Sequence, residues 1–427
     1  MVNRTNGVTR RRLLQMGAGA VPALAVGALP ATATAASLPT LNSVPPELKV
    51  IDTAMRKYIA ERGIKSAQIA VARRGKILMA VGYGRYAVVN PDTGAALGQM
   101  PVRPTTLFRI ASLSKHITSA AVMRLVQDGK LKLSDPVTTL LGLSATADPR
   151  LKQVTVLRLM QNLGGWDREV SKDPLWLDHT IASTLKVPLP IGHDAIIRYV
   201  TARPLDFAPG SKMVYSNYGY MLLGRIIARV SGMSYEAYVQ RKLLAPVGIT
   251  RMRLGRSLQT EISSREVDYQ SGYTTKTVVD ASGKVVPFPY GGFNMPNQDA
   301  NGGWVGSAVD LVKFGMVFDG PGPVLNATSI GRLLAKPETG VTASGSWYGG
   351  GWWVRSNGTG LNTWHNGSMP GTYTFVARVQ NGVSYCALFN RRAEEGTPEF
   401  ESIDPVLGRA VGAVTRWPTT DLTPRFF

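Results

Sequence analysis

Cysteine and histidine are scarce in this chain of 427 residues, and their scarcity excludes several classes of site. The one cysteine, Cys386, cannot form an intramolecular disulfide or supply a thiolate cluster for a structural metal. The four histidines form no HExxH motif or comparable ligand pair. We therefore expect neither a metal nor any other cofactor.

Acidic residues are also few: the chain has 28 acidic and 48 basic residues, which gives a formal net charge of +20. Such an excess favours non-specific contact with anionic polymers, which outside a cell are wall or surface polymers. The basic residues are scattered, however, with no long run and no nucleic-acid-binding motif. Nucleic acid is not an expected partner, and a generally basic, solvated surface is the favoured interpretation.

Long apolar runs are missing, because no segment offers the roughly 20 unbroken apolar residues that a membrane-spanning helix needs. Near the N-terminus, Arg10, Arg11 and Arg12 precede a moderately apolar stretch that Pro22 and several glycines interrupt. Small residues follow at positions 31–36. This order is typical of a cleavable export signal, and the paired arginines make it similar to the twin-arginine type.

The N-terminal pattern predicts the localisation and the domain boundaries at this end. We expect a signal peptide over residues 1–36, cleaved near its end, and a linker over residues 37–45. Cleavage removes four arginines and no acidic residue, so the charge falls from +20 to +16. The expected product is periplasmic or extracellular, with no stable membrane span; a retained N-terminal anchor is the alternative.

The rest of the chain is that of a globular protein, with 44% hydrophobic and 18% charged residues. Strand-like patterns gather near both ends and helical patterns between them. Helices are predicted over residues 46–61, 108–129, 218–231, 235–244 and 403–414, and strands over 66–73, 76–83, 372–379 and 383–390. Turns at Arg74-Gly75 and Asn381-Gly382 predict two hairpins. The stretch 260–299 has no clear assignment.

These patterns predict an α/β (α+β) fold with an antiparallel sheet flanked by helices and built from both chain ends. A mainly helical lobe, about residues 136–336, is inserted into a catalytic domain of residues 46–417, and residues 418–427 form a tail. We expect the active site in the groove between sheet and lobe.

Two copies of S-x-x-K are the first chemical signal, and G-x-S-x-G, the elbow of α/β-hydrolases, is absent. Ser112 and Lys115 open a predicted helix, whereas Ser183 and Lys186 run directly into Val187-Pro188. A spacing of three places the first pair one turn apart on one helical face. The helix start stabilises negative charge on the serine. The lysine can act as a base only if desolvation or a nearby charge lowers its pKa, and a position on an apolar helix would supply that burial. The alternative for Ser112 is an ordinary N-cap.

Two further motifs follow along the chain. Tyr215-Ser216-Asn217 comes after a turn, where a tyrosine can relay a proton and an asparagine amide can bind a substrate carbonyl. His365-Asn366-Gly367-Ser368 precedes a predicted strand. If each motif is considered alone, the alternative for Tyr215 is a side chain that only packs, and the alternative for His365 is a structural histidine.

Together the three motifs resemble the serine β-lactamase and penicillin-binding protein superfamily. They are Phe108 to Lys115 (FRIASLSK), Tyr215 to Asn217 and His365 to Gly367. The branch is that of class C β-lactamases, D-peptidases and family VIII-type esterases. The likeness extends over about residues 46–417. The flanking stretches that share it are residues 125–136, 210–224, 302–314 and 367–390.

The resemblance implies a role for each motif. Ser112 attacks the substrate, Lys115 and Tyr215 shuttle the proton, and Asn217 orients the substrate. The backbone N–H groups of Ser112 and Ser368 form the oxyanion hole. His365 and Gly367 take the places of the lysine and glycine in the K-T-G triad of class C β-lactamases, and both are expected to bind substrate; Asn366 departs from the pattern.

The implied function is that of an exported serine hydrolase acting through an acyl-enzyme on small esters or on amides and peptides that contain D-residues. The alternatives are a transacylase, a D-alanyl-D-alanine carboxypeptidase, a β-lactamase and a non-catalytic protein that binds wall peptides. A mostly neutral histidine holds a substrate carboxylate less firmly than a lysine does, which favours esters over β-lactams. Four tryptophans are candidates to line the walls of the groove; the alternative is that they pack in the hydrophobic core. They are Trp166, Trp304, Trp352 and Trp353.

Overall fold

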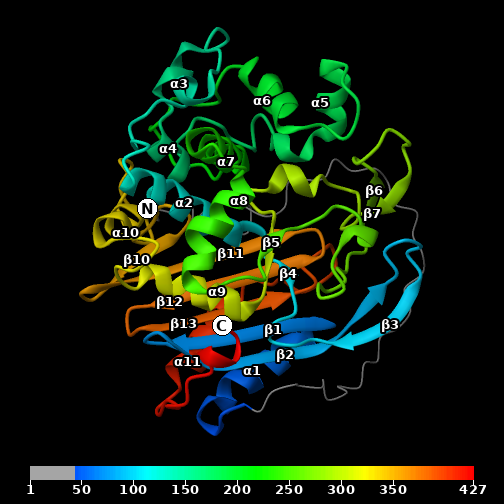
Figure 1. Ribbon diagram of the computed structural model, residues 1–427, viewed down its shortest axis with the longest axis vertical. Helices are drawn as coiled ribbons and strands as arrows, with labels where there is room; N and C mark the ends of the chain where they lie inside the picture. The colour runs from blue at the N-terminus through cyan, green and yellow to red at the C-terminus, as the bar shows by residue number, and fades with distance from the viewer. Residues whose placement is uncertain (1–43) are drawn as a thin grey trace, which may run out of the picture.

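An eight-stranded antiparallel sheet is the centre of the computed structural model, which describes residues 44–427 (Figure 1). Its strand order is β3-β2-β1-β13-β12-β11-β10-β9. The strands are β1 Ser66–Arg73, β2 Lys76–Val89, β3 Ala96–Pro101, β9 Ser346–Tyr348, β10 Trp353–Asn357, β11 Gly360–Met369, β12 Thr372–Val379 and β13 Val383–Phe389.

The two ends of the chain meet in the middle of this sheet. Strand β1 pairs with β13, so that Ala67 lies opposite Phe389 and Arg73 opposite Val383. The strands β1 and β13 are buried on both faces, which explains their almost continuous apolar sequences. The predicted fold class is therefore confirmed: one antiparallel sheet built from both termini and flanked by helices.

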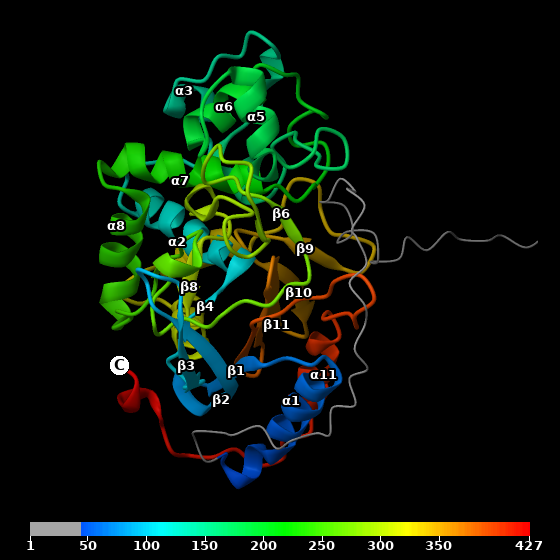
Figure 2. The same ribbon diagram turned by 90° about the vertical axis from the view of Figure 1, so that its right-hand side faces the viewer.

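Helices cover both faces of the sheet (Figure 2). On one face, α1 Lys49–Glu61 and α11 Ile403–Gly412 pack over Ile69 and Val71 of β1. On the other, α9 Ala308–Gly315 contacts β1 and β13. The helical lobe packs beyond α9. It contains α3 Val137–Leu141, α4 Val156–Met160, α5 Asp178–Leu185, α6 His193–Thr201, α7 Asn217–Ser231, α8 Tyr235–Val239 and α10 Ala327–Leu334, and α2 Ser114–Gln127, which precedes the predicted lobe, packs against α7.

The predicted helix 108–129 begins later than expected. Phe108–Arg109 forms the short strand β4, which pairs with β8 (Trp304–Gly306) beside β5 (Arg253–Leu254). The buried guanidinium of Arg109 donates to the carbonyls of Pro289 (2.8 Å) and Arg256 (2.9 Å). These long-range bonds keep the segment extended, and sequence periodicity cannot reveal them.

The unassigned stretch 260–299 holds a small hairpin, β6 Thr274–Lys276 and β7 Val285–Pro287, among loops. The tail returns to the domain, where the carbonyl of Phe426 accepts from Arg251. The predicted signal peptide and most of the predicted linker lie outside the described residues. From residue 44 onward, no helix combines the length and the apolar character needed to cross a bilayer.

Candidate active site

Ser112 lies in a single 3₁₀ turn, Ala111–Leu113, that connects β4 to α2. Ala111 before it adopts a left-handed backbone conformation (φ 49°), and Thr374 Oγ1 donates to the carbonyl of Ile110 at 3.0 Å. Strand β11 passes close to this turn. A Cβ at Gly367 would lie 2.8 Å from that carbonyl and 2.3 Å from Thr374 Oγ1, so only glycine permits the approach. The first and third motifs are thus in contact.

Lys115 is fully buried on the first turn of α2, with its amine directed at Ser112. Its Nζ lies 3.1 Å from Ser112 Oγ, 2.8 Å from Asn217 Oδ1 and 2.7 Å from the carbonyl of Asn301. Burial lowers the pKa of this amine well below its ordinary value. The two N–H groups of a neutral amine can satisfy the two carbonyl oxygens, which leaves its lone pair for the Ser112 hydroxyl.

Asn217 is oriented by a residue that the sequence did not indicate. Its Nδ2 donates to Asp173 Oδ2 at 2.6 Å, and Asp173 also caps the turn Pro174–Trp176 by accepting from the N–H of Leu175. An Asp before a Pro indicates a turn and nothing more. Asn301, which supplies a backbone carbonyl to Lys115, carries no sequence signal either.

Tyr215 lies beside Lys115, whose Nζ is 4.7 Å from the centre of the phenol ring. Burial raises the pKa of the Tyr215 phenol, and the nearby Ser112 side chain opposes this rise. The phenol oxygen makes no well-formed hydrogen bond to any residue from 44 to 427. A buried hydroxyl left without a partner next to a nucleophile can be satisfied by a substrate.

His365 points into the same region from β11, but both of its ring nitrogens are engaged. Nε2 lies 3.0 Å from the Tyr348 hydroxyl and Nδ1 lies 2.5 Å from the carbonyl of Asn366. Burial first, and the nearby Lys115 second, lower the pKa of His365 to about 3. The imidazole is therefore neutral at physiological pH, and mild acidification does not charge it.

The residues after His365 alternate between the faces of β11. Gly367 faces the Ser112 turn, whereas the Asn366 amide reaches the Tyr373 hydroxyl at 3.4 Å on the α1–α11 face. Beyond Trp364, β11 pairs with β12 but no longer with β10. Among residues 44–427, this part of β11 has one backbone edge without a strand partner, as the predicted oxyanion N–H of Ser368 requires.

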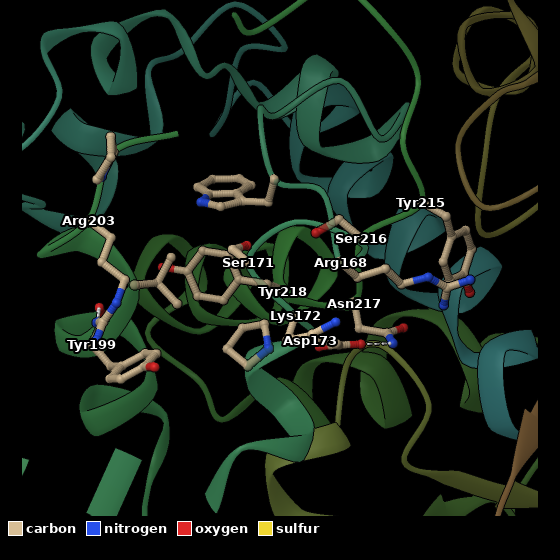
Figure 3. Close-up of a pocket in the computed structure, with 14 residues that line it drawn as sticks. Arg168, Ser171, Lys172, Asp173, Tyr199, Arg203, Tyr215, Ser216, Asn217 and Tyr218 are labelled. Atoms are coloured by element: carbon tan, nitrogen blue, oxygen red, sulfur yellow. Dashed lines mark hydrogen bonds between the residues drawn. The ribbon is translucent and has the colours of Figure 1, made fainter. Parts of the chain in front are cut away.

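A pocket of about 500 Å³, open to solvent, adjoins Tyr215 and Asn217 (Figure 3). Trp166 lines it but also packs in the buried core, and all the lining residues come from the helical lobe rather than from the sheet. Trp304 and Trp352 are instead fully buried core residues, and Trp353 packs on Tyr348.

The second S-x-x-K has no such surroundings. Ser183 is exposed near the end of α5, and Lys186 forms the left-handed cap of that helix. Over residues 44–427, no three His, Cys, Asp or Glu side chains gather as they would to hold a metal ion.

The chain belongs to the beta-lactamase family, whose model matches residues 51–406. This is a family of serine hydrolases, so the three motifs stand in the fold that the resemblance implied.

Curated relatives are similar over parts of the chain. A probable fimbrial assembly protein FimD of Dichelobacter nodosus is 32% identical over 143 residues, which are 34% of this chain and 34% of that protein. A putative D-alanyl-D-alanine carboxypeptidase of Escherichia coli K12 is 26% identical over 241 residues, or 53% of each protein. The chain spans only about a third of the length of the first of these relatives.

Solved structures match over most of the chain. The octameric penicillin-binding protein homologue from Pyrococcus abyssi is 25% identical with a TM-score of 0.62, covering 85% of this chain and 77% of that one. The D-amino acid amidase from Ochrobactrum anthropi SV3 is 22% identical with a TM-score of 0.63, covering 87% and 99%. The second likeness shows a shared fold.

Proposed function

We propose that this protein hydrolyses small esters, or amides and peptides that contain a D-residue, through an acyl-enzyme on Ser112. The observation that carries the proposal is the buried amine of Lys115, 3.1 Å from Ser112 Oγ. Its pKa is lowered by burial, and its other contacts are hydrogen-bond acceptors. A neutral lysine in this position is a general base for the serine.

The proposed reaction has two halves. Ser112 Oγ attacks the substrate carbonyl and gives its proton to Lys115, and the proton passes by way of Tyr215 to the departing alcohol or amine. The acyl group is then esterified to Ser112. In the second half, a water molecule attacks the ester, its proton follows the same path back to Ser112 Oγ, and the acid leaves.

The remaining motif residues bind the reacting groups in this scheme. The backbone N–H groups of Ser112 and Ser368 hold the oxyanion. Asn217 has one amide hydrogen left after its bond to Asp173, and this hydrogen is available to a substrate carbonyl. His365 and Gly367 shape the wall on the β11 side.

Two observations bear on the substrate class. Proteins of similar structure include a D-amino acid amidase and a D-stereospecific amidohydrolase from Streptomyces, which favours D-residue amides. The neutral, fully engaged His365 disfavours β-lactams, because it offers no positive charge to their carboxylate.

Transacylase, carboxypeptidase and wall-peptide-binding functions remain alternatives, and each differs from the proposed reaction in a specific way. A transacylase or a carboxypeptidase uses the same acyl-enzyme and differs in its acceptor or leaving group. A protein that only binds wall peptides needs no base beside the serine, and the buried Lys115 argues against it.

The proposed setting is outside the cytoplasm. The N-terminal arginine pair supports export by the twin-arginine route, and the charge of +16 left after cleavage supports contact with anionic wall polymers. Comparing the mature N-terminus and the cell fraction of the wild type with those of an Arg10→Lys, Arg11→Lys variant tests this setting.

A substrate panel on the purified mature protein tests the activity. It comprises 4-nitrophenyl esters, D-amino-acid amides with their L-enantiomers as matched controls, and nitrocefin, each with wild type and Ser112→Ala. We expect turnover of esters, D-amides or both that Ser112→Ala abolishes. Turnover that survives in Ser112→Ala contradicts the proposal.

A further inference from the structure

The open pocket beside the site has aromatic walls. Its volume of about 500 Å³ lies within the range of roughly 300–1,000 Å³ that small-molecule sites occupy. The rings of Trp166, Tyr199 and Tyr218 line it, and Val200 adds an aliphatic side chain. A smaller cavity of about 220 Å³ lies next to it, since Trp166 and Val200 line that cavity too. The pocket therefore suits a flat, mostly apolar group.

Two of these rings are held in place by their neighbours. The Trp166 indole meets the Tyr218 ring edge to face, with the ring centres 4.8 Å apart. A Cβ at Gly164 would lie 2.6 Å from Cζ3 of the indole, so glycine is needed there. Arg203 donates to the Tyr199 carbonyl, and its guanidinium carbon lies 3.4 Å from the centre of the Tyr199 ring. Walls that are fixed before binding reduce the entropy cost of holding a ligand.

The Tyr218 hydroxyl is the feature that points to a specific ligand. Tyr218 is the second residue of α7 and is 1% exposed, and its hydroxyl makes no hydrogen bond to any residue from 44 to 427. Burial raises the pKa of this phenol well above its ordinary value, so the hydroxyl keeps its proton. A buried tyrosine hydroxyl usually has a partner, because leaving it unpaired is unfavourable. A ligand in the pocket can supply the missing partner.

The pocket and the reacting groups share two residues. Asn217 lines the pocket, and its Oδ1 lies 2.8 Å from the Lys115 amine. Tyr215 lines the pocket as well. Figure 3 shows Tyr218 between Tyr199 on one side and Asn217 on the other. A substituent on the acyl part of the substrate can therefore enter the pocket while the reacting carbonyl stays at the nucleophile.

We propose that this pocket is a subsite for a hydroxyphenyl group on the acyl part of the substrate, and that the Tyr218 hydroxyl determines this specificity. The proposal rests on the proposed function and specifies its substrate class: esters or amides of hydroxyaryl acids, D-tyrosine among them. The substrate ring packs against Trp166 and Tyr199. Its hydroxyl pairs with that of Tyr218, since each can donate or accept. A methyl group in its place leaves the Tyr218 hydroxyl unpaired.

Matched acyl groups test the subsite in wild type. The 4-nitrophenyl esters of (4-hydroxyphenyl)acetic and 3-(4-hydroxyphenyl)propanoic acid are compared with their 4-methylphenyl counterparts, and D-tyrosinamide with D-4-methylphenylalaninamide. Rates with hydroxide alone correct for intrinsic reactivity. We expect kcat/KM to be roughly three- to tenfold higher for the hydroxylated member of at least one pair, the usual value of one neutral hydrogen bond. A ratio of one or below in all three pairs overturns the proposal.

The substitution Tyr218→Phe assigns the preference, because it removes the hydroxyl and keeps the ring. The ratio of kcat/KM between hydroxylated and methylated substrates should fall to about one. Tyr238→Phe is the matched control and should keep the wild-type ratio. Its hydroxyl is also buried and without a partner among residues 44–427, but Tyr238 lies on α8 and does not line the pocket. A preference that survives in Tyr218→Phe, or that disappears in Tyr238→Phe as well, overturns the assignment.

A larger side chain at Val200 tests the pocket by its volume. Val200 lines both cavities, so Val200→Trp fills space that the substrate ring would occupy. We expect kcat/KM for the aryl esters to fall on the order of tenfold relative to 4-nitrophenyl acetate, whose acyl group is too short to enter. Val200→Phe is the smaller replacement if melting curves show that the first variant is unstable. An unchanged ratio of aryl ester to acetate in the folded variant overturns the pocket as the binding place.

Two further measurements separate this proposal from the proposed function. Labelling of Ser112 by a fluorophosphonate and hydrolysis of 4-nitrophenyl acetate report on the catalytic residues without the subsite. If both occur while hydroxylated and methylated substrates react alike, the subsite fails and the proposed function stands. If neither occurs, both fail.

Discussion

The carboxylate of Asp173 accepts a 2.6 Å hydrogen bond from Nδ2 of Asn217, and this bond fixes which end of the amide faces Lys115. An ionised carboxylate can only accept, so the amide must direct its nitrogen to Asp173 and its oxygen to the lysine, 2.8 Å away. The negative charge of Asp173 also raises the pKa of Lys115, in opposition to the larger effect of burial. Asp173 therefore acts on the base both through geometry and through charge.

Replacing Asp173 should shift the pH profile. A lysine base is active when neutral, so the rate falls as the pH falls through its pKa. Asp173→Asn removes the charge that raises this pKa, so the acid limb of kcat/KM should move to lower pH while kcat drops about tenfold because the Asn217 amide is free to flip. The control is Asp167→Asn on the same loop, whose carboxylate pairs with the exposed Lys212. An acid limb that stays in place in Asp173→Asn contradicts this role.

The proton path predicts large and non-additive losses. Lys115→Ala and Tyr215→Phe should each lose on the order of 10² to 10⁴ in kcat on a good ester, and the double variant little more than the worse single one. Tyr220→Phe is the matched control, because its ring also lies near Lys115 (5.5 Å) but its hydroxyl donates to the Met160 carbonyl. Near-normal turnover in Lys115→Ala or Tyr215→Phe shows that the residue lies outside the path.

The state of His365 predicts how pH affects substrate choice. With a pKa of about 3, the imidazole stays neutral between pH 8 and pH 5. We expect 4-nitrophenyl butyrate to react much faster than nitrocefin, and the ratio of their kcat/KM values to be constant over this range. Measuring both substrates at each pH cancels the titration of the shared base. A ratio that shifts toward nitrocefin at pH 5 indicates a charged histidine.

His116, next to Lys115, predicts a pH dependence of stability. It stacks on Trp352 with ring centres 4.5 Å apart, neither ring nitrogen has a partner within residues 44–427, and burial lowers its pKa well below the ordinary value. Below pH 6.5 the unfolded chain binds a proton that the folded chain refuses, so stability falls as the pH falls.

The substitution His116→Phe removes this penalty. From pH 7 to pH 5 the free energy of unfolding should fall by about 2 kcal/mol less in the variant than in wild type, as the ordinary pKa of histidine requires. Urea denaturation at the two pH values measures the difference. His179→Phe, at an exposed position, is the control and should behave as wild type. Equal losses in wild type and His116→Phe would mean that His116 is protonated in the fold.

The sequence was sufficient for the fold class and for the motif residues that meet at the site, because short motifs and strand patterns are local signals. Ser112, Lys115, Tyr215 and His365 were all found in this way. Asp173 and Asn301 were not, since a side chain capping a turn and a backbone carbonyl become functional only through long-range packing. The hydrogen bonding of the His365 ring could not be predicted either, because its Nε2 contacts Tyr348, which belongs to none of the sequence motifs.

The central claim is that Ser112 is the nucleophile, and labelling tests it most directly. Intact-mass analysis after treatment with a fluorophosphonate, followed by peptide mapping, should show one adduct per chain on Ser112. The adduct should be absent from Ser112→Ala and unchanged in Ser183→Ala, which alters the exposed serine of the second S-x-x-K. An adduct that persists in Ser112→Ala, or that maps to Ser183, contradicts the account.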